Sequence, residues 1–590
     1  MNEKRPNQSS NGNGRKRNSR PRKGGKNFAQ KRTIPETSRQ AVKLIPLGGL
    51  EELGKNMWAI EQEGDILLID MGVEMPGSEQ PGVDCVIPNT QYLADKQDQI
   101  KGVVFTSPHP DHIGAAPYLM AMFPNLHVYA TESTFAVLES RHNFYSRDIE
   151  YKKHILKDNA RVRVGSFKVA TFPVGSNVQG TIGLCVYTMQ GKIGYMGSFK
   201  ADTTGENPKW LENAKKTIGT DATILMLGSL GAEAGGFAPT EASIAEEVLK
   251  ICSNPDGKVF ISTFPSMLGR LQQIVDAAEK LEKHIFIEGK SILNTFNTAR
   301  KKGYLQVKPG TFVGPAALDE VPSNKLIVII AGASGDDTPH LMRMANREHS
   351  TFSLQEGDAV AYPSELIPGN ERSVQKVNDN FAKLGAKIHH YRPLGTRHSA
   401  YARQGDLDMV YSAIPAKYVV PANGPMYLLR QNADLAISKG LADRNAIVAK
   451  NGRVILFDYK QRKSTPETVP SYDVMVDGLG VGDLKDVVIR DRQLMSEDGI
   501  LNLIVLIDSA NKKLLQDPDI VSKGFVDMDK SKRLITEINT NIRAIVEGIL
   551  SDAQEINTSY IRDELRDQMG QFVYAKTERR PMVLPVVVII

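Results

Sequence analysis

The stretch that decides the fold is KGVVFTSPHPDHIGAAPYLMAMFPNLHVYA, residues 101–130. The run 101–107 has the pattern of a strand, 112–123 that of a helix, and 127–130 that of a second strand. The polar segment SPHPDH therefore falls on a strand-to-helix loop, a frequent place for functional residues. Its His109, Asp111 and His112 are residue types that bind zinc and related cations.

The sequence on either side of this loop predicts several domains of mixed α/β type. From Ala41 onward, short apolar strands are broken by glycine turns, which is typical of a sheet-rich domain. From about Asp221 to Arg372, helices and strands alternate, which favours an inserted α/β domain with a parallel sheet. A polar stretch at 461–470 has the composition of a linker, and residues 471–590 are expected to fold separately. We find no internal repeat.

Composition restricts the cellular setting. Cys85, Cys185 and Cys252 lie far apart without CxxC spacing, so we expect no disulfide framework and no cysteine-built zinc site. This usage fits a reducing cytoplasm. No stretch approaches the roughly 18 apolar residues that cross a bilayer, so we expect no membrane segment. The run Pro581 to Ile590 is shorter still and predicts a buried strand.

The positive charge of the chain is concentrated at its start. Residues 1–35 carry eleven Lys or Arg against Glu3, which gives +10 there and, from the total of +5, −5 elsewhere. Because this segment has almost no residue that could enter a core, we predict a disordered basic arm over residues 1–40. Such an arm would contact RNA by displacing counterions. The alternative is a solubilising or non-native tail.

Eight local strings, in order along the chain, resemble segments of the RNase J family. They are GGLEELGKN from Gly48, PGVDCVIPNTQYL from Pro81, RLQQIVDAA from Arg270, LMRMANREH from Leu341, IPGNERSV from Ile367, VVIRDRQLMSEDGI from Val487, SKGFV from Ser522 and KTERRPMVLPV from Lys576. The resemblance spans about 40–590. It implies an α/β fold: a metallo-β-lactamase αββα sandwich (41–220 and 373–460), an inserted β-CASP domain (221–372) and a small C-terminal α/β domain (471–590).

The resemblance also implies a two-metal centre, which this sequence keeps only in part. The family's first ligand string is His-x-His-x-Asp-His, and here Ser107 replaces the first histidine. His109 remains for one metal position, and Asp111 with His112 remain for the other. Two zinc ions in such a centre would activate water and hold the phosphoryl oxygens.

The other ligand positions are replaced. The histidine of the second ligand loop falls on Gly175 or Ser176, the bridging aspartate of the family's GDFK string is Ser198, and the late histidine is Asn423. Three of seven expected ligands therefore remain, too few for the three or four that a stable zinc site needs. The resemblance implies one or two zinc ions, but with three ligands we expect no tight binding and interpret the loop as a vestigial polar segment. Asp202 or His398 could supply substitute ligands.

The loop that grips RNA phosphate in the family is altered in parallel. Its HVSGHASQ-like string reads RHSAYARQ here, so Arg397 and Tyr401 replace two histidines while Ser399 stays. An arginine can hold a phosphate through two charged hydrogen bonds without acid–base chemistry. We therefore predict that the loop of Arg397, His398, Ser399, Ala400 and Tyr401 binds RNA phosphate. Drift on an unused surface is the alternative.

Together these features predict an RNA-binding, catalytically impaired RNase J homologue of rRNA processing and mRNA decay. It would act with single-stranded RNA as a homodimer or tetramer, or as a hetero-oligomer with an active RNase J. The second hypothesis is an active metal-dependent 5′-3′ exoribonuclease and endoribonuclease that recruits unusual ligands. A third is a metallo-hydrolase for a small substrate.

Overall fold

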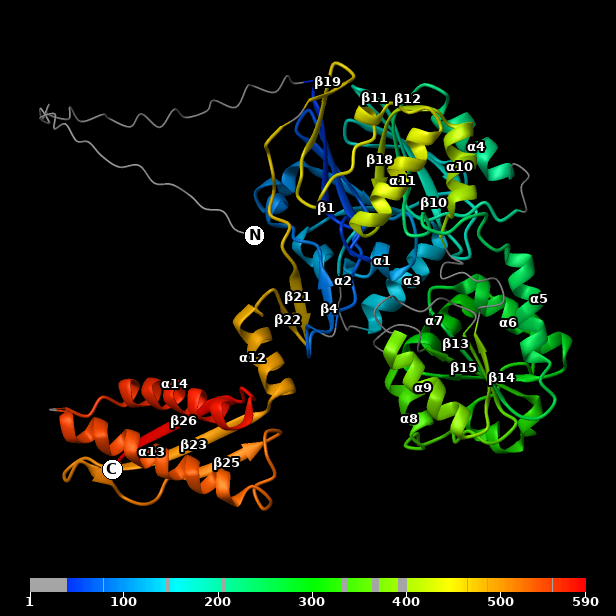
Figure 1. Cartoon of the computed structure of the whole chain (residues 1–590). Helices are drawn as coiled ribbons and strands as arrows, with labels where there is room; N and C mark the ends of the chain where they lie inside the picture. The colour runs from blue at the N-terminus through cyan, green and yellow to red at the C-terminus, as the bar shows by residue number, and fades with distance from the viewer. Residues whose placement is uncertain are drawn as a thin grey trace, which may run out of the picture. The chain divides into compact units, whose positions relative to one another are not determined.

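The computed structural model describes residues 40–77, 79–144, 149–203, 208–331, 338–362, 371–390, 401–463, 465–484, 486–553 and 555–590. Residues 1–39 of the predicted basic arm and residues 397–400 of the predicted phosphate-binding loop lie outside these ranges. Figure 1 shows the course of the chain from blue near residue 40 to red at residue 590. No helix in the described ranges combines the length and apolar character needed to cross a bilayer.

The first domain begins with an eight-stranded mixed sheet. Its order is β20-β19-β1-β2-β3-β5-β6-β7. The bounds are β1 Val42–Gly48, β2 Met57–Gln62, β3 Asp65–Ile69, β5 Ile100–Val104, β6 His127–Ala130, β7 Lys152–Ile155, β19 Ile455–Asp458 and β20 Gln461–Lys463. Strand β20 uses the first residues of the predicted linker, because Gln461–Lys463 pair with β19.

A six-stranded sheet forms the second layer, in the order β18-β12-β11-β10-β9-β8. Its bounds are β8 Arg161–Val164, β9 Phe167–Pro173, β10 Ile182–Thr188, β11 Gly191–Met196, β12 Ala222–Gly228 and β18 Ala416–Ala422. One core lies between the two sheets and contains residues of both, among them Trp58, Leu184 and Val420. This is the layered α/β architecture predicted from the sequence.

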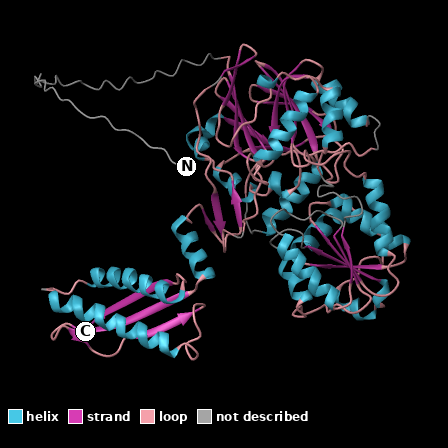
Figure 2. Cartoon of the chain, in the orientation of Figure 1, coloured by secondary structure: helices cyan, strands magenta, loops and turns pink. Residues whose placement is uncertain are grey.

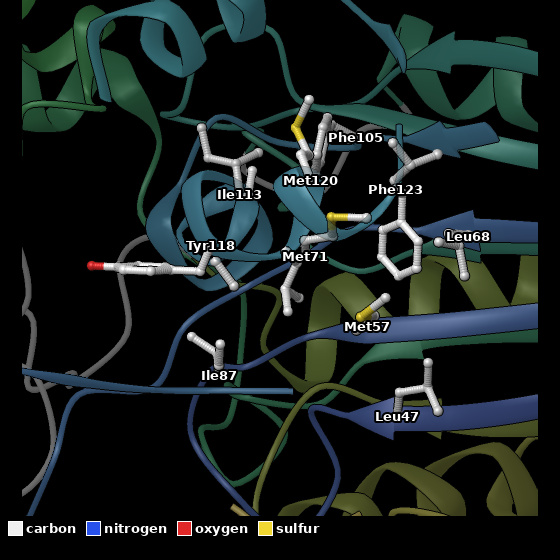
Figure 3. Packing of buried hydrophobic residues seen from close by; sticks show 14 of the residues in the cluster. Leu47, Met57, Leu68, Met71, Ile87, Phe105, Ile113, Tyr118, Met120 and Phe123 are labelled. Carbon is white, nitrogen blue, oxygen red and sulfur yellow. The ribbon is translucent and has the colours of Figure 1, made fainter. Parts of the chain in front are cut away.

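Helices and short helical turns cover the outer faces of both sheets. The eight-stranded sheet buries Met57, Leu68 and Phe105 against Ile113 and Phe123 (Figure 3). On the six-stranded sheet, Phe172 and Leu225 pack against Leu211 and Leu407. The elements are α1 Pro110–Ile113, α2 Ala116–Leu119, α3 Glu132–Phe144, α4 Lys209–Ile218, α10 Gln404–Ala413, α11 Met426–Ser438, η1 Gln91–Gln99, η2 Met120–Met122 and η5 Asp443–Asn445.

The predicted helix over 112–123 is wrong as a continuous element, since α1, α2 and η2 replace it. The cause lies in the backbone carbonyls of α1. Those of Pro110, Asp111 and His112 accept hydrogen bonds from the amides of Val73, Asn56 and Met71 at 3.0, 3.1 and 2.7 Å. Because these contacts fix the turn against β2 and β3, the segment follows the sheet rather than one straight helix axis.

An inserted domain separates β12 from β18, which are neighbours in the six-stranded sheet. It has a five-stranded parallel sheet in the order β14-β15-β13-β16-β17, with helices on both faces (Figure 2). The bounds are β13 Val259–Thr263, β14 His284–Glu288, β15 Leu326–Ala331, β16 Ala359–Tyr362, β17 Lys387–His390, α5 Glu241–Cys252, α6 Leu268–Lys280, α7 Lys290–Lys301, α8 Thr338–Ala345, α9 Glu371–Lys383, η3 Pro315–Glu320 and η4 Ser323–Lys325.

The C-terminal part has its own sheet and core. A small sheet of β4 Cys85–Ile87, β21 Val474–Asp477 and β22 Gly480–Val481 precedes helix α12 Asp486–Glu497. Strand β23 Ile500–Asp508 then pairs with β24 Lys513–Leu514, β25 Asp519–Lys523 and β26 Met582–Ile589. Helices α13 Lys532–Asp552 and α14 Thr558–Thr577 pack on this sheet through a shared apolar core.

The last strand corrects one prediction. The run at the end of the chain is a strand, but it is not buried, because Leu584, Val586 and Val588 are each about two-fifths exposed. They alternate with residues that turn toward the helices. Strand β23 shows the same alternation, with every second residue buried. The C-terminal sheet therefore has one covered face and one open face.

Candidate metal centre

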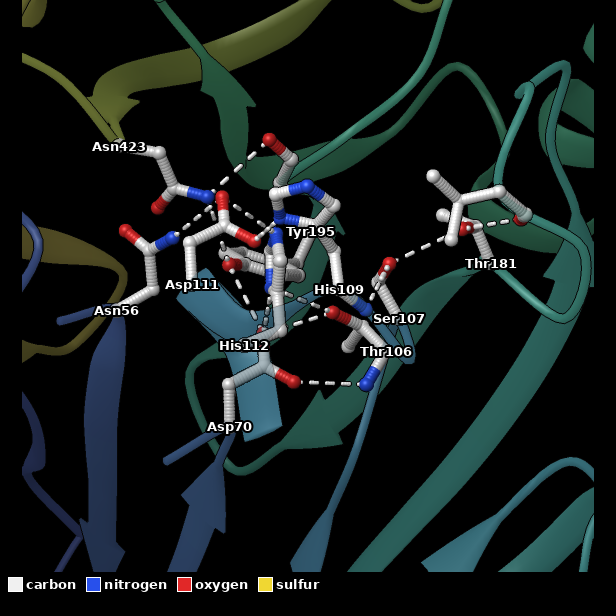
Figure 4. A network of polar contacts seen from close by, with 12 residues as sticks. Asn56, Asp70, Thr106, Ser107, His109, Asp111, His112, Thr181, Tyr195 and Asn423 are labelled. Carbon is white, nitrogen blue, oxygen red and sulfur yellow. Dashed lines mark hydrogen bonds and ion pairs between the residues drawn. The ribbon is translucent and has the colours of Figure 1, made fainter. Parts of the chain in front are cut away.

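The predicted ligand loop is anchored by a residue that sequence reasoning missed, Asp70. It directly follows β3, is completely buried and has a left-handed backbone with φ of 62°. One carboxylate oxygen accepts the Thr106 amide at 2.7 Å, and the other accepts the Thr106 hydroxyl and faces His112 Nδ1, also at 2.7 Å (Figure 4). The only signal in the sequence is an acidic residue that ends the apolar run DILLIDMG.

This arrangement fixes His112. With Nδ1 donating to Asp70, the ring directs Nε2 toward the carboxylate of Asp111, whose Oδ2 lies 3.6 Å away. Carboxylates that orient histidine ligands in this way are common around protein-bound metals. His112 Nε2 is buried and has no hydrogen-bond partner among the described residues. These two donor atoms could face one cation.

The charges within this pair are strongly coupled. Burial opposes the charge on His112, but the carboxylates of Asp111 and Asp70 outweigh it and raise its pKa to about 9. Burial likewise opposes ionisation of Asp111, yet His112 and His109 lower its pKa to about 2. Near neutral pH and without a metal, the loop therefore holds a buried imidazolium between two carboxylates.

His109 is also engaged within the loop. Its Nδ1 lies 2.6 Å from Asp111 Oδ1, and its ring makes an edge contact with Phe264 at 5.6 Å between centroids. The side-chain amide of Asn56 reaches the other Asp111 oxygen at 3.4 Å. Asp111 is thus the common partner of both remaining histidines.

The replaced first ligand, Ser107, now has a structural contact. It is fully buried, and its hydroxyl lies 3.1 Å from that of Thr181. The same oxygen accepts the His109 amide at 3.3 Å. Ser107 therefore ties the ligand loop to the start of β10.

The structure separates the two alignments of the second ligand loop. At Gly175 a Cβ atom would come within 2.3 Å of the Lys200 carbonyl oxygen and 2.8 Å of Trp210 Nε1. Ser176 has a side chain, but its hydroxyl accepts the Val178 amide at 3.1 Å in a local turn. Gly175 therefore has no room for a histidine, and Ser176 serves the turn.

The remaining positions offer neutral groups. Ser198 follows β11 and is almost buried. Asn423 is buried with φ of 51°, and its amide donates to the Gly197 carbonyl at 3.1 Å and to the Tyr195 hydroxyl at 3.4 Å. Neither residue supplies the anion that would hold two cations together.

The proposed substitutes are placed differently. Asp202 accepts the Glu241 amide at 2.7 Å, at the start of α5, and lies 3.9 Å from Lys200. Of the predicted phosphate-binding loop, Arg397, His398, Ser399 and Ala400 lie outside the described residues. Tyr401 is described and half-buried, directly before the bridge between Arg403 and Gly231.

Two groups of three metal-ligating side chains occur elsewhere in the described ranges. Glu52, Glu74 and Asp473 surround the ammonium group of Lys55, which is buried and paired with all three. Glu288, His340 and His349 meet at the carboxyl end of β14. In the second group His349 Nδ1 accepts the amides of Thr351 and Phe352 at 3.2 Å, so its proton sits on Nε2, the atom facing Glu288.

Comparison with known families finds three matching domain models. Residues 80–236 match the β-lactamase superfamily domain, residues 256–381 match the ribonuclease J β-CASP domain, and residues 487–590 match the ribonuclease J C-terminal domain.

Curated proteins match over nearly the whole chain. Ribonuclease J2 of Bacillus subtilis is 30% identical over 548 residues, covering 92% of this chain and 98% of that protein. Ribonuclease J 1 of Streptococcus pyogenes is 29% identical, covering 92% and 97%, and ribonuclease J 2 of Staphylococcus aureus is 28% identical, covering 92% and 98%. A solved protein of unknown function from Enterococcus faecalis matches with a TM-score of 0.50 at 14% identity, covering 71% of this chain and all of that one, which supports the fold alone.

Proposed function

Because this chain belongs to the ribonuclease J family of RNA processing and decay, we propose that it binds single-stranded RNA but cleaves it weakly or not at all. One observation carries the proposal. The position predicted for the bridging carboxylate is Ser198, while within the predicted ligand loop Asp111 and His112 are placed to share a cation. A zinc site needs three or four protein ligands to hold its ion firmly.

The fit of a metal to this site is therefore partial. The superfamily implies a metal cofactor, whose chemistry would be activation of a water for attack on phosphorus. Here Asp111 Oδ2 and His112 Nε2 could hold one ion, with Asp70 orienting the histidine. The two-zinc arrangement does not fit, since Gly175 has no space for a ligand and Asn423 offers an amide.

The oriented pair of Asp111 and His112 also supports the second candidate, an active 5′-3′ exoribonuclease and endoribonuclease. The two are distinguished by incubating 5′-monophosphorylated single-stranded RNA with the chain and added zinc or manganese. An Asp111→Ala, His112→Ala double variant is run beside it. Since both residues are buried, His142→Gln serves as a control for general damage, because it changes a buried histidine outside the site.

We expect equally slow cleavage by the chain and by the double variant, with RNA still retained on a filter by both. Cleavage by the chain and by His142→Gln that disappears in the double variant would overturn the proposal and establish an atypical metal centre. If the unchanged chain does not retain RNA on the filter, the RNA-binding part of the proposal is refuted. Melting curves by circular dichroism verify that the variants are folded.

We also infer that the chain assembles with a second copy through the open face of its C-terminal sheet. Leu584, Val586 and Val588 of β26 are exposed on it. Val521 of β25 is also exposed, and Asn502 of the intervening strand β23 lies between Val521 and Leu584. In the described part of the chain, β26 pairs with β23 alone, so its outer edge can pair with another strand. A twofold contact lets the same strand and face serve both copies.

Sedimentation velocity tests this assembly with the variant Leu584→Lys, Val586→Lys. We expect the wild-type dimer to become a monomer, and Tyr560→Lys, on an exposed part of α14, to leave the dimer intact. A monomeric wild-type chain would refute the homodimer. Dimerisation that appears only when an active family member is added would favour a hetero-oligomer. The domain limits given from the sequence remain predictions that limited proteolysis can test.

A further inference from the structure

A strongly basic surface lies at the edge of the first domain. Its residues follow the predicted ligand loop by about 40 positions in the sequence. Residues 152–168 include six exposed basic side chains and one acidic residue, Asp158. We call these six residues the basic edge: Lys152, Lys153, Lys157, Arg161, Arg163 and Lys168. Excluding residues 1–35, the chain has a net charge of −5. The basic edge is therefore positive in a part of the chain that is negative as a whole.

The topology brings these residues together. Strand β7 is the last strand of the eight-stranded sheet, β8 is the last of the six-stranded sheet, and only residues 156–160 connect them. Leu156 and Val164 pack into the same core between the sheets. The two strand edges therefore lie at one end of the sandwich. Arg161, Arg163 and Lys168 project from the face of β8 and β9 that points away from this core, whereas Lys153 lies over the Phe135 ring of α3 on the other sheet.

The charges of the basic edge are poorly neutralised. Lys153 is paired with Glu139 at 2.6 Å. Within the described ranges, no acidic side chain forms an ion pair with any of the other five. Arg163 and Lys168 are also directly opposite each other on β8 and β9. Like charges in that relation repel and destabilise a sheet, so an anion between them would remove a cost.

We propose that the basic edge is a binding surface for the phosphate backbone of single-stranded RNA, outside the predicted phosphate-binding loop; this rests on the proposed RNA-binding function. Arg161 and Arg163 alternate with Val162 and Val164, so both guanidinium groups project from the same face of β8. Arginine matches phosphate with two parallel hydrogen bonds. Lys168, opposite Arg163, extends the row onto β9.

A competing explanation is protection of the sheet edges. Lysine on an exposed edge strand discourages pairing with another chain. This explanation accounts for Lys152 and Lys157 on or beside β7. It does not require Lys168, because β9 is an inner strand of its sheet. The two explanations also predict different effects of neutralising the residues.

The test measures RNA affinity of the full chain by fluorescence anisotropy. The probe is a labelled unstructured single-stranded RNA, and a chelator is added to prevent cleavage. The edge variant is Lys152→Gln, Lys157→Gln, Arg161→Gln, Arg163→Gln, Lys168→Gln. A control variant makes the same change of net charge at exposed residues that are each paired with an acid: Lys439→Gln, Lys530→Gln, Lys576→Gln, Arg533→Gln, Arg566→Gln.

We expect the edge variant to bind RNA at least about tenfold more weakly. Its slope of log affinity against log salt should be shallower by up to about 3.5, since each of five phosphate contacts on a single strand contributes about 0.7. The control variant should stay within about threefold of wild type. If the edge variant binds RNA as tightly as wild type, or if the control variant loses as much RNA affinity, the basic edge is not an RNA-binding surface. The proposed function stands in either case. Self-association of the edge variant with unchanged RNA affinity assigns the edge to strand protection instead. Failure of the wild-type chain itself to bind RNA refutes the proposed function and this inference together.

Discussion

Two parts of the candidate metal centre differ in their role in the fold. One is the loop of His109, Asp111 and His112, and the other is the set of three later positions at which ligands were predicted. The loop's backbone carbonyls accept hydrogen bonds from amides in the segments that flank β2 and β3, and Asp70 contacts both Thr106 and His112. The later positions predicted for ligands, Gly175 or Ser176, Ser198 and Asn423, carry no histidine or carboxylate. We therefore expect Asp70 and His112 to contribute to folding whether or not a metal binds at the loop.

The largest expected effect tests that contribution to folding directly. Replacing Asp70 with Ala leaves His112 as a buried cation without its closest carboxylate and leaves the Thr106 amide without its acceptor. We expect the free energy of unfolding to fall by about 3 to 5 kcal/mol, the cost of breaking a buried ion pair. Urea denaturation measures it, with Asp221→Ala, at an exposed residue, as the control. A loss no larger than the control's would mean that Asp70 has no folding task.

His142, a buried histidine for which burial outweighs the nearby carboxylate of Glu139, extends the comparison to pH. Burial lowers the pKa of His142 to about 4, and the charge of Arg141 adds to the effect. The pKa of His112, by contrast, is raised. A depressed histidine pKa gives stability that is present above the ordinary value of 6.5 and lost as pH falls toward 4. We expect this loss to reach up to about 3 kcal/mol and to be absent in His142→Gln. Parallel pH curves for the two proteins, from denaturant melts, would contradict it.

A smaller effect separates the two candidate positions of the second ligand loop. Gly175→Ala introduces a Cβ where the Lys200 carbonyl and Trp210 leave no space, and we expect it to lower the free energy of unfolding by about 2 kcal/mol. Ser176→Ala removes one local hydrogen bond and should cost less than about 1 kcal/mol. Equal costs in thermal melts would show that the glycine is not required by packing.

The smallest effect is expected at the position of the lost bridging ligand. Ser198→Ala should change the free energy of unfolding by less than about 1 kcal/mol and leave RNA retention unchanged. Calorimetric titration with zinc provides the sharper readout, because we expect identical zinc uptake before and after the change. A drop in zinc uptake would make Ser198 a ligand and remove the contrast between the two regions.

The sequence predicts a ligand loop because three ligand-type residues stand together at a strand-to-helix junction, and the structure places Asp111 and His112 side by side. Asp70 could not be found in the same way, since it is 42 residues from His112 and resembles the end of any apolar strand. The choice between Gly175 and Ser176 depended on distant backbone atoms of Lys200. The open face of β26 was also missed, because an unbroken apolar run does not distinguish a strand buried on both faces from one buried on a single face.

The insertion between β12 and β18 has a consequence for the order in which the chain folds during synthesis. These adjacent strands are separated by residues 229–415, and β1 finds its neighbour β19 only after a still longer delay. At ordinary rates of translation the ribosome needs roughly 10 to 40 s to make the intervening segment. During that time the edge of β12 that pairs with β18 has no partner strand. The first domain is therefore expected to finish folding after the domain that interrupts it.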